Sequence, residues 1–276
     1  MSKPPNNPAG RLLKVVSDLK QIQANIIADE AWADVLGIEV SDTGSLLKGI
    51  GATLQLGQDT IEAIKKQNVD QDLYIGHVNQ ILIAFQKMHL GARIRDTMNN
   101  VKQEDIVGLR FCDEQLSRNA PEKTLNENDL KKIHEGIMSL IDEVAKGNID
   151  EYLRQYLLDK LDLLRQAVAM YHISGIKPIE NAIHNVLGST AVDSKLKDKF
   201  RASSLSQKVF KFVLGLYITI QCVNNIAQLP ESIDKILPIS KPAISKIIQT
   251  KGVDFENVQD AELEEDIETE KNNKNK

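Results

Sequence analysis

Cysteine is scarce in this sequence, since Cys112 and Cys222 are the only two among 276 residues. They stand far apart and form none of the paired spacings of a disulfide framework, which excludes a small disulfide-stapled secreted domain. We therefore expect two reduced thiols in a cytoplasmic protein, because buried free cysteines behave there as small hydrophobic residues.

Aromatic residues are also scarce, at 4% of the chain, whereas hydrophobic residues make up 42%. Leucine, isoleucine and valine must therefore fill the core, and that mixture favours helices packed on helices. Stretches of alternating polar and apolar residues bounded by turns, which would predict strands, are missing. We predict an all-α fold, a multi-helix array or bundle whose short connections favour mostly antiparallel neighbours.

The body of the chain has no surplus of positive charge. The net charge is -5, and residues 251–276 hold nine acidic residues and four lysines, so residues 1–250 sum to zero. A general nucleic-acid binder needs an excess of lysine and arginine to displace counterions from phosphates. We therefore expect no nucleic-acid partner.

The chain carries no recognisable catalytic or cofactor motif. Gly49, Gly51 and Gly57 fall inside a helical pattern without the lysine and serine or threonine that follow a phosphate-binding loop. Glu180 and His184 have the one-turn spacing of metal ligands, but a single pair does not make a site. We predict no catalytic, cofactor-binding or metal-binding residue, no small-molecule substrate and no enzyme activity.

Helices are predicted where apolar residues recur at steps of three and four. Asp42 and Asp150 suit helix starts, Thr124 has the capping-box spacing to Glu127, and Gly37 suits a helix end. The predicted helices cover about residues 12–26, 31–36, 42–66, 70–88, 106–116, 124–147, 150–175 and 178–188. Trp32, the only tryptophan, is predicted to anchor the core.

Four regions are expected along the chain. Residues 1–10, rich in proline and asparagine, predict a disordered lead rather than a signal peptide, and residues 11–190 predict one helical domain. Residues 191–250 predict a basic linker, an apolar helix and short helices broken by proline. Residues 251–276 predict a disordered acidic tail.

One predicted helix has a seam of alternating three- and four-residue steps interspersed with glycine. Glycine weakens a helix but lets another backbone approach closely, so this seam indicates close helix contact, with a partner or inside the chain. We name the seam as a candidate interaction site, formed by Leu47, Ile50, Leu54, Gly57, Ile61 and Ile64.

A basic stretch followed by an apolar one allows two interpretations. Lys195 to Lys211 holds six cations and one acid, and Phe212 to Leu229 holds no charge over 18 residues. A bilayer core needs about 20 apolar residues, so the length is marginal. A buried core helix is the favoured interpretation; the alternative is a segment that binds anionic lipid. In that alternative the candidate membrane contacts are Lys208, Lys211, Phe212, Leu216 and Tyr217.

Several short motifs carry a resemblance. They are Asp72, Leu73 and Tyr74, then Leu109 to Asp113, then Leu157, Leu158, Tyr171 and Gly175. With them the chain resembles a group of uncharacterised bacterial all-helical proteins over roughly residues 11–190. That group has no established activity, so the resemblance implies a bacterial cytoplasmic origin and no catalytic residue.

The function expected from the sequence is a non-enzymatic helical protein–protein interaction module of the bacterial cytoplasm, binding a protein partner or itself. Two alternatives stay open. One is a membrane-associating or membrane-perturbing effector using residues 195–229, peripheral to the membrane. The other is an enzyme whose site is assembled from residues scattered in the sequence.

Overall fold

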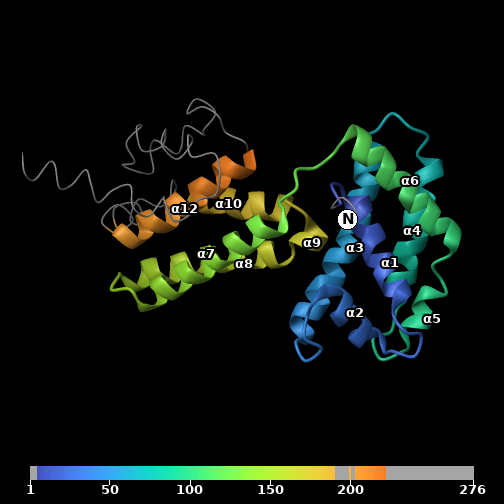
Figure 1. Cartoon of the computed structure of the whole chain (residues 1–276), viewed down its shortest axis with the longest axis horizontal. Coiled ribbons are helices and arrows are strands. Elements are labelled where there is room, and N and C mark those ends of the chain that lie inside the picture. The colour runs from blue at the N-terminus through green and yellow to red at the C-terminus, as the bar shows by residue number, and fades with distance from the viewer. Residues whose placement is uncertain (1–4, 190–198, 200–202, 222–276) are drawn as a thin grey trace, which may run out of the picture. The chain divides into compact units, whose positions relative to one another are not determined.

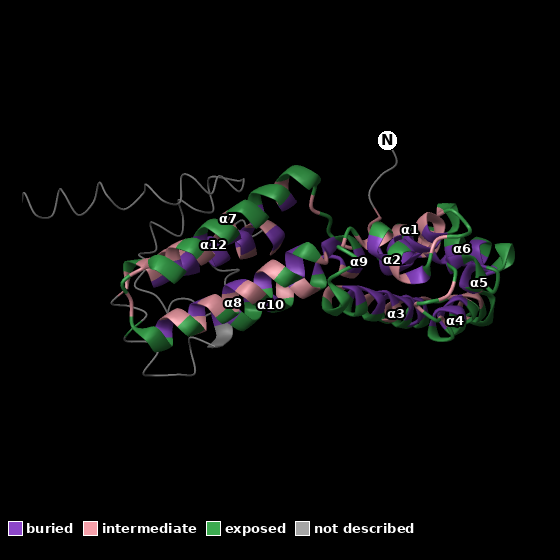
Figure 2. Cartoon of the chain, turned by 90° about the horizontal axis from the view of Figure 1, so that it is seen from below, coloured by how far each residue is buried: buried purple, intermediate pink, exposed green. Residues whose placement is uncertain are grey.

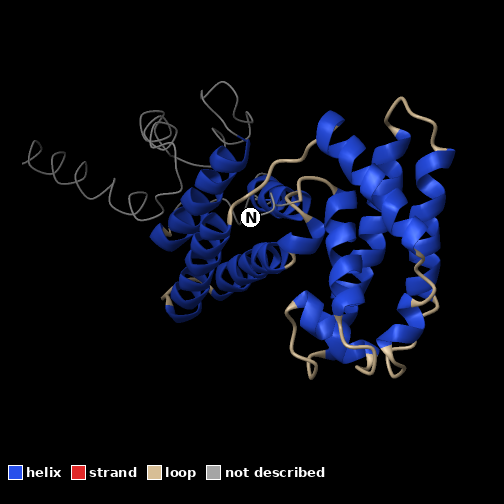
Figure 3. Cartoon of the chain, turned by 45° about the vertical axis from the view of Figure 1, so that its right-hand side comes forward, coloured by secondary structure: helices blue, strands red, loops and turns tan. Residues whose placement is uncertain are grey.

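The computed structural model describes residues 5–189, 199 and 203–221, and in this part of the chain the regular secondary structure is entirely helical (Figure 3). This confirms the all-α prediction. The chain divides into two compact units. Unit 1 comprises residues 1–124 and 170–176, and unit 2 comprises residues 125–169 and 177–276. Residues 11–190, predicted as one helical domain, are thus divided between the two units.

Unit 1 contains four long helices that pack on one another, with shorter ones beside them (Figure 1). Helix α1 packs on α3 and α6, and α4 packs on the same two helices. The helices of this unit are α1 (Pro8–Gln21), α2 (Ala28–Leu36), α3 (Thr43–Lys65), α4 (Asp72–Gln86), α5 (Ile94–Met98), α6 (Gln103–Asn119) and α9 (Tyr171–Ser174). The short helix α5 was not predicted from the sequence.

Trp32 lies in the core of unit 1, as predicted, and is fully buried. Its ring meets that of Phe85 edge-on, with 5.2 Å between the ring centroids. Its indole N–H donates to the sulfur of Met88 at 2.8 Å. Burying a large aromatic ring while giving its polar atom a partner stabilises the fold on both counts.

The helix ends follow local chemistry with some shifts. Gly37 closes α2 in the left-handed conformation, with a φ of 65°, and Asp42 caps α3 by accepting from the Ser45 N–H at 3.0 Å. The cap of α7 is Asn126 instead of the predicted Thr124, because the Asn126 side chain accepts from the Asp129 N–H at 2.9 Å. Helix α1 ends at Gln21, five residues before the predicted end.

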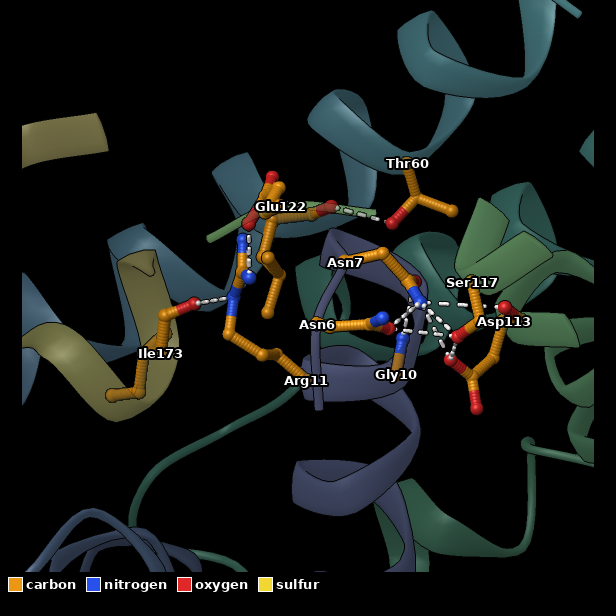
Figure 4. Close-up of polar contacts among 10 residues, drawn as sticks. Asn6, Asn7, Gly10, Arg11, Thr60, Asp113, Ser117, Glu122 and Ile173 are labelled. Carbon is orange, nitrogen blue, oxygen red and sulfur yellow. Dashed lines mark hydrogen bonds and ion pairs between the residues drawn. The ribbon is translucent and has the colours of Figure 1, made fainter. Parts of the chain in front are cut away.

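The predicted disordered lead does not extend over residues 7–10. Asn7 caps α1, accepting from the Gly10 N–H at 2.9 Å, and is fully buried. Its side-chain N–H groups donate to the Asp113 carboxylate at 2.7 Å and the Ser117 hydroxyl at 2.8 Å (Figure 4). A proline-rich start therefore becomes an ordered helix cap because α6 supplies acceptors for the buried amide.

Over its described residues, unit 2 contains four helices. Helix α8 packs on α7 and α10, and α12 packs on α10 and α7. The bounds are α7 (Glu127–Lys146), α8 (Glu151–Ala169), α10 (Lys177–Ser189) and α12 (Ser204–Gln221). Purple buried stripes run along these helices beside green exposed ones in Figure 2, as expected for amphipathic helices around one core.

Helix α12 pairs with α7 in the opposite chain direction. A methyl group on Gly136 would lie 2.5 Å from the Phe212 ring, whereas further along α7 Glu143 pairs with Lys208 at 2.7 Å. Higher numbers on α7 thus meet lower numbers on α12, so this pair is antiparallel. For the helix pairs in general, the antiparallel arrangement stays a prediction.

Candidate functional site

The predicted glycine seam on α3 faces mainly inward. Ile50, Ile61 and Ile64 belong to the core of unit 1, and Leu54 is half-buried. Gly57 is buried against Leu82 of α4, where an added Cβ would collide with the leucine side chain. The close helix contact therefore exists inside the unit, between α3 and α4. Of the six seam residues only Leu47 is well exposed, at 53%.

The predicted membrane-contact residues lie on a packed helix. Leu216 is fully buried and Phe212 is 7% exposed. Tyr217 lies beside the His184 ring, with centroids 5.8 Å apart. Lys208 pairs with Glu143, and Lys211 lies half-buried on the same helix. In this conformation the apolar side of α12 belongs to the core of unit 2. This favours the interpretation of the apolar stretch as a buried core helix over that of a lipid-binding segment.

Two further observations concern the basic and apolar segment, residues 195–229. Lys199 pairs with Asp150 at 2.7 Å, and its hydrogen bond holds the pKa of this carboxyl below the usual value. Lys199 and Lys208 of the basic stretch thus meet acidic partners inside unit 2. Within the described residues, every helix is too short or too polar to cross a bilayer. Residues 222–229 lie outside the described residues.

His77 of α4 and Asp105 of α6 form a link between these two helices. Asp105 is buried and accepts from the Lys102 N–H at 3.0 Å, which starts α6, while its other oxygen lies 3.2 Å from His77 Nδ1. The His77 ring lies against Gly108, where any side chain would collide with it. Gly108 therefore allows the ring to lie on the α6 backbone and hold α4 in register.

Apolar side chains are exposed beside this link. Leu73 on α4 is 66% exposed, and on α6 Phe111 is 57% and Val107 37% exposed. The Cys112 thiol lies 3.9 Å from the Tyr74 carbonyl, so α4 and α6 pair at this level. Leu73 directly precedes Tyr74, and Phe111 directly precedes Cys112. Leu73 and Phe111 therefore lie at the same end of the α4–α6 helix pair. We call Leu73, His77, Val107 and Phe111 the α4–α6 surface.

The α4–α6 surface was missed as a site in the sequence. Leu73 and His77 fall on one stripe of three- and four-residue steps with Ile81 and Phe85, yet only the last two of these are buried. Phe111 stood in one of the motifs that carry the family resemblance. The available signal was that Val107 and Phe111, four residues apart, fall off the buried stripe of Ile106, Leu109, Cys112 and Leu116.

Cys112 beside the surface is a poor nucleophile. It is fully buried, and this burial raises the pKa of its thiol to about 12. The thiolate is the reactive form of cysteine, so the thiol is protected at neutral pH. Among the described residues, no three histidine, cysteine or acidic side chains gather closely enough to hold a metal ion.

The protection of Cys112 can be measured. In a Cys222→Ser background, an aromatic disulfide reagent at pH 8 should modify Cys112 about a thousandfold more slowly in the native protein than in urea. The reason is that a pKa about three units above normal reduces the thiolate fraction by that factor. Equal rates in the two states would show that the thiol is exposed and normal.

No protein-family model, no curated protein and no solved structure matches this chain.

Proposed function

We propose that the chain is a non-enzymatic protein-interaction module whose unit 1 binds a helix of a protein partner on the α4–α6 surface. The observation that carries this proposal is the exposure of Leu73 and Phe111 at one end of two packed helices, with Val107 exposed one turn earlier on α6. The resemblance to bacterial helical proteins extends the proposal to the bacterial cytoplasm.

The clustering of these side chains matters more than their exposure. Single exposed leucines are ordinary on protein surfaces and need no explanation. An aromatic ring together with two aliphatic side chains on adjacent helices is less ordinary, because grouped exposed apolar residues mark interaction sites. Large aromatic residues also supply much of the binding energy in protein interfaces. Phe111 is therefore the residue on which we expect binding to depend most.

The scaffold under the surface is fixed in advance. The His77–Asp105 contact and the close approach at Gly108 tie α4 to α6. A surface that does not need to order itself on binding loses less conformational entropy, so more of the contact energy appears as affinity.

The partner chemistry follows from the shape and rim of the surface. The apolar face of a partner helix can pack along two neighbouring helices, as helices do on one another in protein cores. Exposed Asp72 and Arg110 stand next to Leu73 and Phe111 in the sequence, and exposed Glu114 follows Phe111 by three positions, so both signs of charge are present. A mixed rim suits an amphipathic protein helix better than a polyanion, which requires a uniformly basic face.

Site-specific photo-crosslinking tests the proposal. A benzoylphenylalanine at position 111 should yield a discrete adduct with one protein in native cells, because the ring sits in the contact. The matched control places the same residue at Met138, an exposed apolar position on α7 of unit 2. An adduct of twice the chain mass would identify the partner as a second copy. No adduct at 111, or identical adducts at both positions, would reject the surface.

A further inference from the structure

The connection between α8 and α10 belongs to a different unit from the helices it joins. Helices α8 and α10 pack on each other in unit 2, whereas residues 170–176 between them belong to unit 1. Within that segment, α9 packs on α1 and α3, and Ile173 is buried in the unit 1 core. The chain thus contributes a seven-residue segment to unit 1 in the middle of a helical hairpin of unit 2, and Ile173 of this segment enters the core.

Arg11 of α1 holds this segment in unit 1. Its side chain is only 7% exposed. Its Nε–H donates to the Ile173 carbonyl at 2.9 Å, and another guanidinium N–H donates to the Glu122 carboxylate at 2.5 Å (Figure 4). A buried arginine is stable only when its charge and donors are matched in this way.

Gly175 completes the contact from the side of the segment. Its φ of 70° and ψ of -157° lie in a region that essentially only glycine adopts. A methyl group there would lie 2.6 Å from the guanidinium carbon of Arg11. Glycine is therefore required both for the backbone path and for the close approach of the arginine.

The partners of Arg11 lie near every point where the chain passes between the units. The chain passes from unit 1 to unit 2 after residue 124, returns after residue 169 and leaves again after residue 176. Glu122 lies just before the first of these points, and Ile173 lies between the second and the third. We propose that residues 170–176 are a releasable strap and that Arg11 is the latch that keeps it docked on unit 1. Releasing the strap would leave the α8–α10 hairpin closed while uncovering the site of Ile173 on α1 and α3.

The strap depends on the latch for a physical reason. A helix of four residues is far below the length at which a helix is stable by itself, so α9 forms only while it is docked. Docking includes the burial of Ile173 and the hydrogen bond from Arg11 to the Ile173 carbonyl. Without Arg11 the Ile173 carbonyl loses a buried donor, which shifts the segment toward local opening.

Hydrogen–deuterium exchange of the full chain tests the latch. In Arg11→Met, peptides covering 170–176 should exchange at least about tenfold faster, while peptides in the middle of α4 change much less. The control is Lys14→Met on the same helix, because Lys14 is exposed and pairs with Asp18 one turn along α1. An equal rise in α4 would show that Arg11 supports the whole core, and that outcome would overturn the proposal. Unchanged exchange of the strap would overturn it as well.

Gly175→Ala provides a second test that keeps Arg11 in place. The added methyl group should push the guanidinium away and release the same peptides, without removing a charge from the core. If Arg11→Met does not fold, this variant decides alone. Strap peptides that stay as protected in Gly175→Ala as in the unchanged chain would contradict the latch.

Discussion

Replacing Trp32 by alanine should lower the free energy of unfolding of unit 1 by about 3–5 kcal/mol, the usual range for truncating a buried tryptophan. The side chain is fully buried, meets Phe85 edge-on and donates to Met88, so the variant leaves a cavity and removes an aromatic contact. Hydrogen–deuterium exchange of α1 and α4 across a urea series gives this change in free energy for unit 1 separately.

Two control variants test whether the loss of stability comes from the buried position of Trp32. Leu47→Ala removes an exposed side chain on α3 and should change the stability by no more than about 0.5 kcal/mol. Trp32→Phe keeps one ring against Phe85 and should lose less than Trp32→Ala. A loss under about 1 kcal/mol in Trp32→Ala would contradict the position of the tryptophan in a close-packed core.

Replacing Leu216 by aspartate should detach α12 from unit 2. Leu216 is fully buried, and an ionised carboxylate there has no partner to offset its lost hydration, so we expect a cost above about 4 kcal/mol. Trypsin can report the result, because Lys208 and Lys211 lie on the same helix. Cleavage after these lysines should accelerate by at least about a hundredfold, since proteolysis follows the population of the open form.

The matched control is Leu163→Asp, the same substitution at an exposed position on α8 of the same unit. It should leave trypsin cleavage of α12 nearly unchanged. If Leu216→Asp were tolerated as well as Leu163→Asp, α12 would not be a core helix. The sequence-based alternative, in which this segment binds lipid, would then regain support.

Sequence patterns predicted what depends on neighbours within a few residues. The apolar stripe of α7, Leu130, Ile133, Ile137, Leu140 and Val144, is the set that the structure buries. Gly37 ends α2 as predicted because a left-handed residue closes the last turn. Asp150 lies at the start of α8, accepting from the Leu153 N–H at 3.2 Å. In each case the structure-forming interaction spans four residues or fewer.

The sequence could not predict contacts between residues far apart in the chain. Asn7 and Asp113 are 106 positions apart, and Arg11 and Ile173 are 162 positions apart. Asn7 falls in the predicted disordered lead because the acceptors of its amide lie on α6, and a local sequence pattern does not reveal them. The division into units was not visible for the same reason, since Ile173, a core residue of unit 1, lies on α9 between two helices of unit 2.

The exposed side chains of the α4–α6 surface show a further limit of periodicity. A three- and four-residue repeat identifies apolar residues on one face but does not say whether that face is covered. Leu73 and His77 continue the stripe of Ile81 and Phe85, yet Leu73 is exposed and His77 is only half-buried beside α6. Apolar residues that stay exposed on the surface are also the ones that indicate a binding site for a partner.

The crosslinking yield at position 111 in a chain that also carries Leu73→Ser tests the interaction surface most directly. If Leu73 and Phe111 belong to one binding surface, the yield should fall at least about fivefold, the effect of losing about 1 kcal/mol of binding energy. Leu47→Ser, an equally drastic change at an exposed leucine of α3, should leave the yield unchanged. An undiminished adduct in the Leu73→Ser chain, or equal losses in both chains, would contradict a partner site on α4 and α6.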